Sequence, residues 1–280
     1  MTTAAYKCGI IEVADNVYAF IQDNCATNAG FIVSDEGVMV IDSLMTPTLA
    51  GKLYAAVRNV TKAPIRFLIN THFHGDHVFG NQYFLPAPIV AHANCRDELT
   101  EKFDGNMQRY RARTELIPEL DQIKMTLPDV TFQDRMSIRL GGREIQLSFH
   151  GRAHSNSDIL LYLPEEKLLF VADLAVNKTL PAFPDGHITK WLTVLEEVAK
   201  FDADTFVPGH GPVGDRSDFD DAVELLSLLN SEIRRGYDGG LSEEDTVKQV
   251  KVGRFADFAG QDRVGLITRM AYLAYRGELQ

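Results

Sequence analysis

Short apolar runs separated by turn residues fill the first part of the chain. Such runs predict strands at Val17 to Gln22, Gly30 to Val33 and Val38 to Ile41, with Asp35-Glu36-Gly37 as a turn. From Thr46 to Val60 the apolar residues recur at helical spacing, which places them on one face of a helix. The pattern therefore predicts strands of one sheet and a helix that covers it.

A strand-then-helix rhythm continues through the next segment. A strand is predicted at Arg66 to Asn70, another at Pro88 to Ala91, and a helix near Asn94 to Phe103. Residues 104–132 are mixed in charge and show weak helical periodicity around Tyr110 to Leu120. We expect residues 104–132 to form an insertion that acts as a lid.

Alternating and apolar runs return in the second half and predict a second sheet. Gly141-Gly142 indicates a hairpin within it. A helical face from Ile188 to Val198 precedes a strand at Thr205 to Val207, and amphipathic helices follow over 215–280. The strands predicted for this sheet are Ser137 to Leu140, Glu144 to Phe149, Ile159 to Leu163 and Leu168 to Val171.

The length and composition of the chain are typical of a soluble globular protein. With 280 residues and 45% hydrophobic residues, we expect one domain over 1–280 with a helical extension at 215–280. A net charge of −11 without a dense basic run argues against nucleic acid as a partner. The chain lacks a signal-peptide pattern and a membrane-spanning apolar run. Cys8, Cys25 and Cys95 are too few and scattered for a disulfide framework, so we expect a cytoplasmic protein that does not contact membranes.

Thr71-His72-Phe73-His74-Gly75-Asp76-His77 packs four metal-capable side chains into six positions. Imidazole and carboxylate groups suit Zn²⁺, Fe or Mn. In an extended segment His72 and His74 point to the same side and can share one ion. After Gly75 the chain can turn, so that Asp76 and His77 face a second ion. The alternative, histidines that cap a strand and face solvent, is disfavoured because matching segments follow.

Those segments are Gly151-Arg152-Ala153-His154, Val171-Ala172-Asp173 and Pro208-Gly209-His210-Gly211, each after a predicted strand. Strand ends are places where functional side chains gather. We expect one ion on His72, His74 and His154, a second on Asp76, His77 and His210, and Asp173 between them.

Residues 15 to 215 resemble the metallo-β-lactamase superfamily, because these segments occur in the family's order. Asp42, after Val40-Ile41, fills the family's first segment. The resemblance implies an α/β (α+β) fold, a four-layer αββα sandwich with the site at one sheet edge. It also implies that Asp42 is a buried support that orients the imidazoles and is not itself a ligand.

A site with two divalent ions indicates a hydrolase. We expect the ions to be Zn²⁺, with Fe or Mn as alternatives. We expect a metal-bound hydroxide, oriented by Asp76 as the catalytic residue, to attack a small ester, thioester, lactone or amide-like substrate. The alternatives are β-lactamase activity and a non-hydrolytic role in iron-dependent oxygenation, redox chemistry or sensing. A serine or cysteine nucleophile is disfavoured, because no Gly-x-Ser-x-Gly elbow is present.

The branch of the superfamily is indicated by single positions. Asp173 stands where one lactamase subclass has cysteine, so the chain looks more similar to glyoxalase-II-like enzymes and to a general group of bacterial hydrolases. Val176 stands where quorum-sensing lactonases place a tyrosine, and only Lys178 could replace the glutathione-binding residues of glyoxalase II.

The sequence indicates the substrate contacts and the oligomeric state less specifically than it indicates the metal ligands. We expect a small-molecule substrate that contacts Phe73, His187 and Tyr110, with Met107 and Arg113 joining if the lid closes. His92 and His150 fit no ligand position, and we expect structural roles for them. A homodimer remains open as the oligomeric state.

Overall fold

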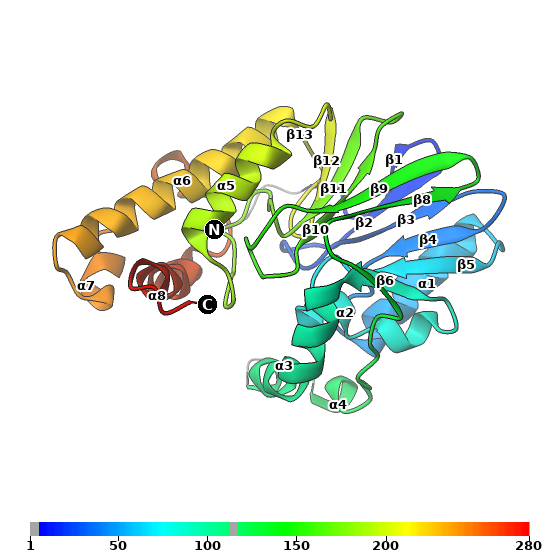
Figure 1. Cartoon of the computed structure of the whole chain (residues 1–280), viewed down its shortest axis with the longest axis horizontal. Coiled ribbons are helices and arrows are strands. Elements are labelled where there is room, and N and C mark those ends of the chain that lie inside the picture. The colour runs from blue at the N-terminus through cyan, green and yellow to red at the C-terminus, as the bar shows by residue number, and fades with distance from the viewer. Residues whose placement is uncertain (1–5, 113–116, 280) are drawn as a thin grey trace.

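A computed structural model describes residues 6–112 and 117–279 of the chain. Within these residues the strands form two sheets, one of seven strands and one of six. The sheets stack face to face, with helices on both outer sides (Figure 1). No helix in the described ranges is both long and apolar enough to cross a membrane.

The first sheet has the order β1-β2-β3-β4-β5-β6-β7. Its neighbours run antiparallel up to β4 and parallel from β4 to β7. The parallel part puts the ends of β4, β5 and β6 at one edge of the sheet. The strands are β1 (Gly9–Ala14), β2 (Val17–Ile21), β3 (Ala29–Val33), β4 (Val38–Ile41), β5 (Ile65–Ile69), β6 (Ile89–His92) and β7 (Val130–Phe132).

The second sheet has the order β13-β12-β11-β10-β9-β8. The pair β11 and β12 is parallel, and the hairpin of β8 and β9 turns at Gly141-Gly142 as the sequence predicts. The strands are β8 (Arg135–Leu140), β9 (Arg143–Phe149), β10 (Ile159–Leu163), β11 (Leu168–Ala172), β12 (Thr205–Pro208) and β13 (Gly214–Asp215).

Apolar side chains of both sheets meet in one core. Ile41 and Val17 of the first sheet belong to the same buried cluster as Leu161 and Phe170 of the second. Helix α1 (Pro47–Val60) packs Leu53 and its neighbours on the outer face of the first sheet. Helices α5 (Ile188–Val198), α6 (Arg216–Asp238) and α8 (Val264–Tyr275) cover the outer face of the second. The predicted four-layer αββα sandwich is therefore confirmed.

The remaining helices surround the ends of the strands. The segment 104–132 contains the last turns of α3 (Ala93–Arg111), α4 (Ile117–Leu120) and strand β7. Helix α3 is longer than predicted, because its mostly polar residues hide the helical period. A lid role for this segment stays a prediction, and Arg113 lies outside the described residues. The other helices are α2 (Gly75–Val78), η1 (Asn81–Phe84), α7 (Glu243–Val247), η2 (Gly253–Phe255) and η3 (Gln261–Arg263).

Candidate metal centre

Strand ends deliver the predicted ligands to one place. Asp42 follows β4, and the loop after β5 carries the histidine cluster into α2. His154 follows β9, Asp173 directly follows β11, and His210 follows β12. Among the described residues, three overlapping groups of ligand atoms lie within 4.8 Å of one another: His72, His74 and His154; His72, His77 and Asp173; and Asp76, His77 and His210.

Three imidazole nitrogens converge in the first group. His74 Nδ1 lies 3.1 Å from His72 Nε2 and 2.8 Å from His154 Nε2. A tetrahedral zinc site with bonds of about 2.0–2.1 Å has nitrogen–nitrogen edges of roughly 3.3 Å. The spacing of the three nitrogens is therefore close to what one ion requires.

Asp173 stands between the two ends of the cluster. Its Oδ2 lies 3.2 Å from His154 Nε2 and 3.4 Å from His210 Nε2, and its Oδ1 lies 3.3 Å from His77 Nε2. Asp76 Oδ2 lies 3.5 Å from His210 Nε2. One carboxylate thus faces histidines of both groups, as a bridging ligand would.

Two donor atoms of the cluster lack the hydrogen bonds that buried polar atoms usually make. His77 Nε2 and Asp173 Oδ1 are buried without a hydrogen-bond partner among the described residues. Buried polar atoms are normally paired, and an ion between them would satisfy both. The residues therefore fit divalent metal ions.

The outer nitrogens of three imidazoles, those of His72, His77 and His210, contact other groups. His77 Nδ1 lies 2.7 Å from Asp42 Oδ2, and His210 Nδ1 lies 2.9 Å from the carbonyl oxygen of Cys25. His72 Nδ1 lies 3.1 Å from Thr71 Oγ1. Such contacts fix which nitrogen faces inward. Asp42 sits where the resemblance places a supporting carboxylate.

Asp185 is a functional candidate that the sequence did not reveal. Its Oδ2 lies 3.1 Å from His74 Nε2, and its Oδ1 accepts a hydrogen bond from Lys102 Nζ at 3.2 Å. His74 therefore donates outward through Nε2 and presents Nδ1 to the centre. Asp185 belongs to the loop before α5, two residues from His187. The sequence therefore pointed to this loop but not to Asp185 itself.

Two hydroxyl groups hold Asp76. The Tyr110 hydroxyl donates to Asp76 Oδ1 at 2.7 Å, and Thr27 Oγ1 donates to Asp76 Oδ2 at 2.6 Å. Tyr110 comes from α3 and Thr27 from the loop before β3. Tyr110 was predicted to lie at the site, whereas no pattern in the sequence pointed to Thr27.

Burial and charge set the protonation of the cluster. Burial lowers the pKa of His154 to about 3 and that of His72 well below its usual value. Burial opposes charge on Asp173, but His210 and His77 hold its pKa well below the usual range. Burial also opposes charge on His210, yet Asp173 and Asp76 raise its pKa to about 9. His72 and His154 are therefore neutral, whereas Asp173 is ionised and His210 is protonated at neutral pH.

Backbone geometry is specialised around the cluster. Asp42 has φ 59° and Ala172, just before Asp173, has φ 45°. Such positive values are costly for residues other than glycine and gather at functional sites. A Cβ on Gly209 would lie 1.9 Å from Asp173 Oδ1. Only glycine lets the backbone approach Asp173 this closely.

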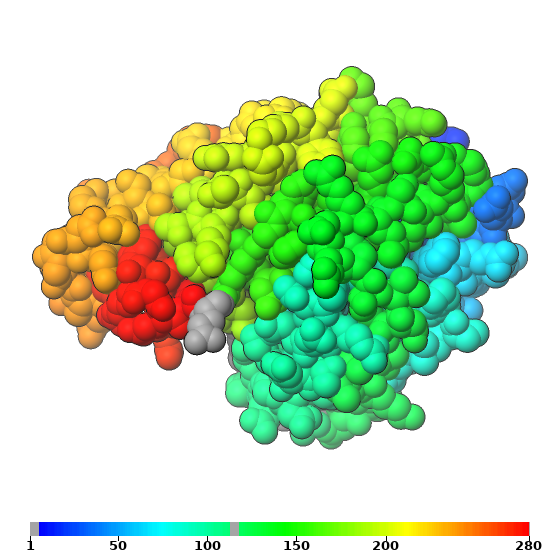
Figure 2. Space-filling model, viewed as in Figure 1, coloured from blue at the N-terminus to red at the C-terminus, as the bar shows by residue number. Residues whose placement is uncertain are grey.

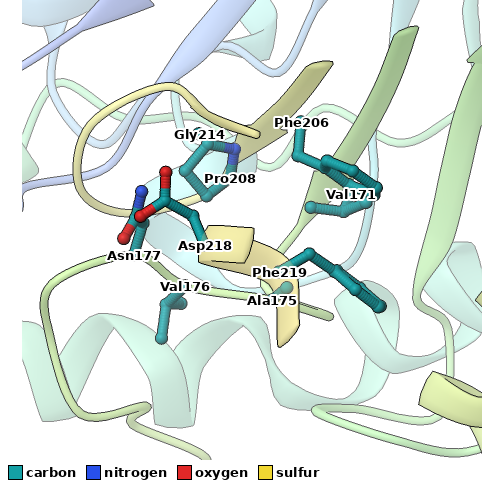
Figure 3. A pocket seen from close by; sticks show the side chains of 9 residues that line it. All are labelled: Val171, Ala175, Val176, Asn177, Phe206, Pro208, Gly214, Asp218 and Phe219. Atoms are coloured by element: carbon teal, nitrogen blue, oxygen red, sulfur yellow. The ribbon is translucent and has the colours of Figure 1, made fainter. Parts of the chain in front are cut away.

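A cavity of about 840 Å³ opens onto the centre. His74, Asp76, Asp173 and His210 line its floor. Figure 2 shows the surface hollowed between the red C-terminal residues and the blue-green residues of α3. By contrast, the cavity in Figure 3, beside Asn177 and Asp218, holds about 10 Å³ and has no room for a substrate.

The expected substrate contacts meet with mixed outcomes. Tyr110 lines the large cavity. Phe73 does not, because its side chain is fully buried in an apolar cluster with Phe79 and Leu99. The alternation that points His72 and His74 inward turns Phe73 the other way. His187 does not line the cavity either, and its Nδ1 lies 3.2 Å from Thr189 Oγ1.

The other two histidines have structural partners. His92 accepts a hydrogen bond from the Asn94 backbone at the start of α3 and stacks on Phe149. His150 Nε2 lies 2.9 Å from Ser148 Oγ. Both stand apart from the three groups of candidate metal ligands.

Known enzymes share this fold and parts of this sequence. A linear primary-alkylsulfatase from Pseudomonas sp. is 24% identical over 260 residues, covering 79% of this chain and 49% of that enzyme. A type 2 metallo-β-lactamase from Bacillus cereus is 24% identical, covering 71% of this chain and 73% of that enzyme. This chain thus spans about half the length of the alkylsulfatase.

Solved structures agree on the fold. A stereoselective inverting sec-alkylsulfatase from Pseudomonas sp. superimposes with a TM-score of 0.75 at 19% identity, over 96% of this chain and 50% of that one. A metallo-β-lactamase from Pontibacter korlensis gives a TM-score of 0.66 at 20% identity, over 79% of this chain and 99% of that one. The sequence model of the metallo-β-lactamase superfamily matches residues 23–210. The chain therefore belongs to the metallo-β-lactamase superfamily, whose members are hydrolytic enzymes.

Proposed function

We propose that the chain is a binuclear metal-dependent hydrolase that acts on a small ester-type molecule. The observation that carries the proposal is the overlap of three ligand groups, in which His72 and His77 are shared and Asp173 faces both ends. When bound, two divalent ions lower the pKa of a shared water to near neutrality and polarise the bond under attack.

The residues divide into two ligand sets. His72, His74 and His154 would hold one ion, and Asp76, His77 and His210 the other, with Asp173 shared between them. Imidazole-rich donors favour Zn²⁺, while the carboxylates also accept Fe or Mn. We prefer Zn²⁺.

Asp76 is the proposed catalytic residue. It lines the cavity, and the Tyr110 and Thr27 hydroxyls fix both of its oxygens. Neighbouring histidines, despite burial, hold its pKa well below the usual range, so that it is ionised. An ionised, immobilised carboxylate at the cavity floor orients the attacking water toward the substrate.

The substrate class rests on the cavity and on relatives. A volume of about 840 Å³ lies in the range of pockets that enclose small molecules. We favour esters, thioesters, lactones or amide-like molecules. Sulfate esters join the candidates because an alkylsulfatase is among the relatives, and β-lactams because lactamases are. Asp173 in place of a cysteine ligand argues against one lactamase subclass.

Elemental analysis combined with a substrate panel tests this proposal. The panel holds a carboxylic ester, a thioester, a lactone, a β-lactam and a sulfate ester. We expect bound metal, turnover of at least one class and loss of that turnover after chelation. We also expect Asp76→Ala to lose most activity, whereas Asp204→Ala at an exposed position retains it. A protein that binds no metal, or an Asp76→Ala variant as active as the parent, would contradict the proposal.

A further inference from the structure

Helix α8 forms one wall of the cavity, opposite α3. Four of its residues line the cavity: Leu266, Arg269, Met270 and Leu273. Their spacing of three and four residues places them on a single helix face. This helix lies outside residues 23–210, the part that matches the superfamily. The cavity therefore combines a family-type floor with a wall that belongs to the C-terminal helices.

The charge of the cavity differs from that of the whole chain. The chain carries a net charge of −11, but the charged residues that line the cavity away from its metal-ligand floor are arginines: Arg109, Arg263 and Arg269. Arginine pairs with carboxylate, sulfate and phosphate groups through two parallel hydrogen bonds. The walls of the cavity therefore favour an anion.

The three arginines differ in availability. Arg263 donates to Thr179 Oγ1 at 3.2 Å and to the carbonyl oxygen of Leu180. Arg109 Nη1 lies 3.7 Å from Asp185 Oδ2. Arg269 is exposed, and its side chain makes neither a hydrogen bond nor an ion pair with any described residue. Arg269 is thus the guanidinium that can bind a ligand without breaking an existing contact.

Arg269 is separated along α8 from Arg263, the residue that links this helix to the loops beside the metal centre. Arg263, just before α8, bonds Thr179, and the neighbouring Lys178 carbonyl lies 3.9 Å from Cys25 Sγ. The Cys25 carbonyl in turn contacts His210. Arg263 is therefore linked to the metal centre, and Arg269 follows it six residues later, about 9 Å further along the helix axis.

The lining beside Arg269 is apolar. Leu266 and Leu273 flank it on α8, Leu279 follows α8, and Met45 and Leu49 line the cavity from the other side. An apolar chain buried here gains about 25 cal/mol for each Å² removed from water. The cavity therefore combines metal-ligating side chains, apolar side chains and one free cation.

We propose that α8 forms a second subsite, which binds the end of the substrate remote from the bond that is cleaved. The substrate is an apolar chain that ends in an anionic group, a carboxylate, sulfate or phosphate, paired with Arg269. This inference rests on the proposed hydrolase function for the identity of the reacting end. It assigns the specificity of that function to the C-terminal extension.

Ligand binding to the zinc-loaded protein tests the subsite without requiring turnover. Calorimetry would compare linear dicarboxylates, from adipate to dodecanedioate, with monocarboxylates of equal length. One carboxylate can bind at the metal end in both series. We expect at least one dicarboxylate to bind about tenfold more tightly than its monocarboxylate, the gain typical of one charge-assisted pair.

Three variants locate the anion. Arg269→Gln should remove the dicarboxylate preference and leave monocarboxylate affinity unchanged. Arg276→Gln, a matched control that pairs with Glu243 after the end of α8, should keep the preference. Arg109→Gln should also keep it. A preference that persists in Arg269→Gln, or that vanishes in Arg109→Gln instead, overturns the proposal, as does the absence of a preference at every length.

Turnover of the substrate panel separates this inference from the proposed function. An Arg269-dependent preference without hydrolysis of any panel member would support the subsite and contradict the hydrolase proposal. Hydrolysis with equal affinities for both ligand series would support the hydrolase proposal and contradict the subsite.

Discussion

Asp42 Oδ2 lies 2.7 Å from His77 Nδ1, and the same carboxylate accepts hydrogen bonds from the backbone N–H and the hydroxyl of Thr71. One buried side chain at the end of β4 therefore fixes the loop that follows β5. His77 Nε2 is turned toward Asp173 Oδ1, 3.3 Å away. The metal centre depends on a residue that is not itself among its candidate ligands.

Replacing Asp42 with alanine should weaken both the fold and the metal centre. The change leaves His77 Nδ1 and the Thr71 N–H buried without partners, which costs about 3 kcal/mol of unfolding free energy. It also frees the His77 ring, and lost support of this kind typically lowers metal affinity about 10- to 100-fold. Chemical denaturation and metal titration measure the two effects. Asp202→Ala, at an exposed partner of Lys167, should change neither; unchanged metal affinity in Asp42→Ala would refute the supporting role.

Gly209→Ala should displace Asp173. The new Cβ would lie 1.9 Å from Asp173 Oδ1, so the carboxylate or the backbone must move. We expect metal affinity to fall more than about tenfold while circular dichroism still reports a folded chain. The control is Gly51→Ala inside α1, where the added Cβ meets no atom within 4 Å. That substitution should raise stability by about 0.5–1 kcal/mol and leave metal content unchanged. Full metal affinity in Gly209→Ala would show that the close approach is unimportant.

Asp185→Asn tests the contact that orients His74. An amide can no longer offer two anionic oxygens to His74 and Lys102, so the preference of His74 for presenting Nδ1 weakens. We expect metal affinity to fall about 10-fold, measured by competition with a coloured chelator. Asp204→Asn, at an exposed position on the same chain, serves as the control. Equal metal affinities of the two variants would show that Asp185 does not support the metal centre.

The sequence predicts which candidate ligands lie close together, and it does so for a local reason. Each candidate ligand lies in a loop that follows a strand or in the dense histidine cluster, so its placement depends mainly on strand ends meeting at one edge. Asp42, His154, Asp173 and His210 arrive from separate segments, yet the family order links them. The fold class and the candidate ligand set are therefore predictable from the sequence.

The supporting contacts depend on tertiary packing and left little trace in the sequence. Thr27 and Asp185 lie in irregular loops, where a threonine or an aspartate is most often a turn residue. Phe73 was expected to contact the substrate because it lies between two candidate ligands in the sequence. The alternation of side chains places it in the core instead. The sequence did not predict that α8 lines the cavity. The pattern of an amphipathic helix indicates which of its faces is buried, but not which part of the molecule the helix packs beside.

Metal binding should release protons at neutral pH. Burial disfavours charge on His210, but Asp173 and Asp76 raise its pKa to about 9, so the metal-free protein holds this proton at pH 7. A ligand imidazole must be neutral. Apparent affinity should therefore rise with pH up to about 9. Calorimetric titrations in two buffers of different ionisation enthalpy measure the released protons, and identical heats in both buffers would contradict this expectation.

The same shift predicts the pH dependence of the metal-free fold. The folded-state pKa of His210 lies above its ordinary value of 6.5, so its contribution to stability is complete below pH 6.5. That contribution is lost as pH rises through about 9. The melting temperature of chelator-treated protein should accordingly fall between pH 6.5 and 9, and a rise over this interval would be the opposite result.

The number of ions bound by the parent protein and by Asp173→Ala tests the binuclear centre most directly. Asp173 faces His77, His154 and His210, so its loss should affect both ends of the cluster. Elemental analysis of purified, zinc-supplemented protein should give about two ions per chain for the parent and fewer for Asp173→Ala. One ion or none in the parent, or an unchanged count in the variant, would contradict a two-metal site bridged by Asp173.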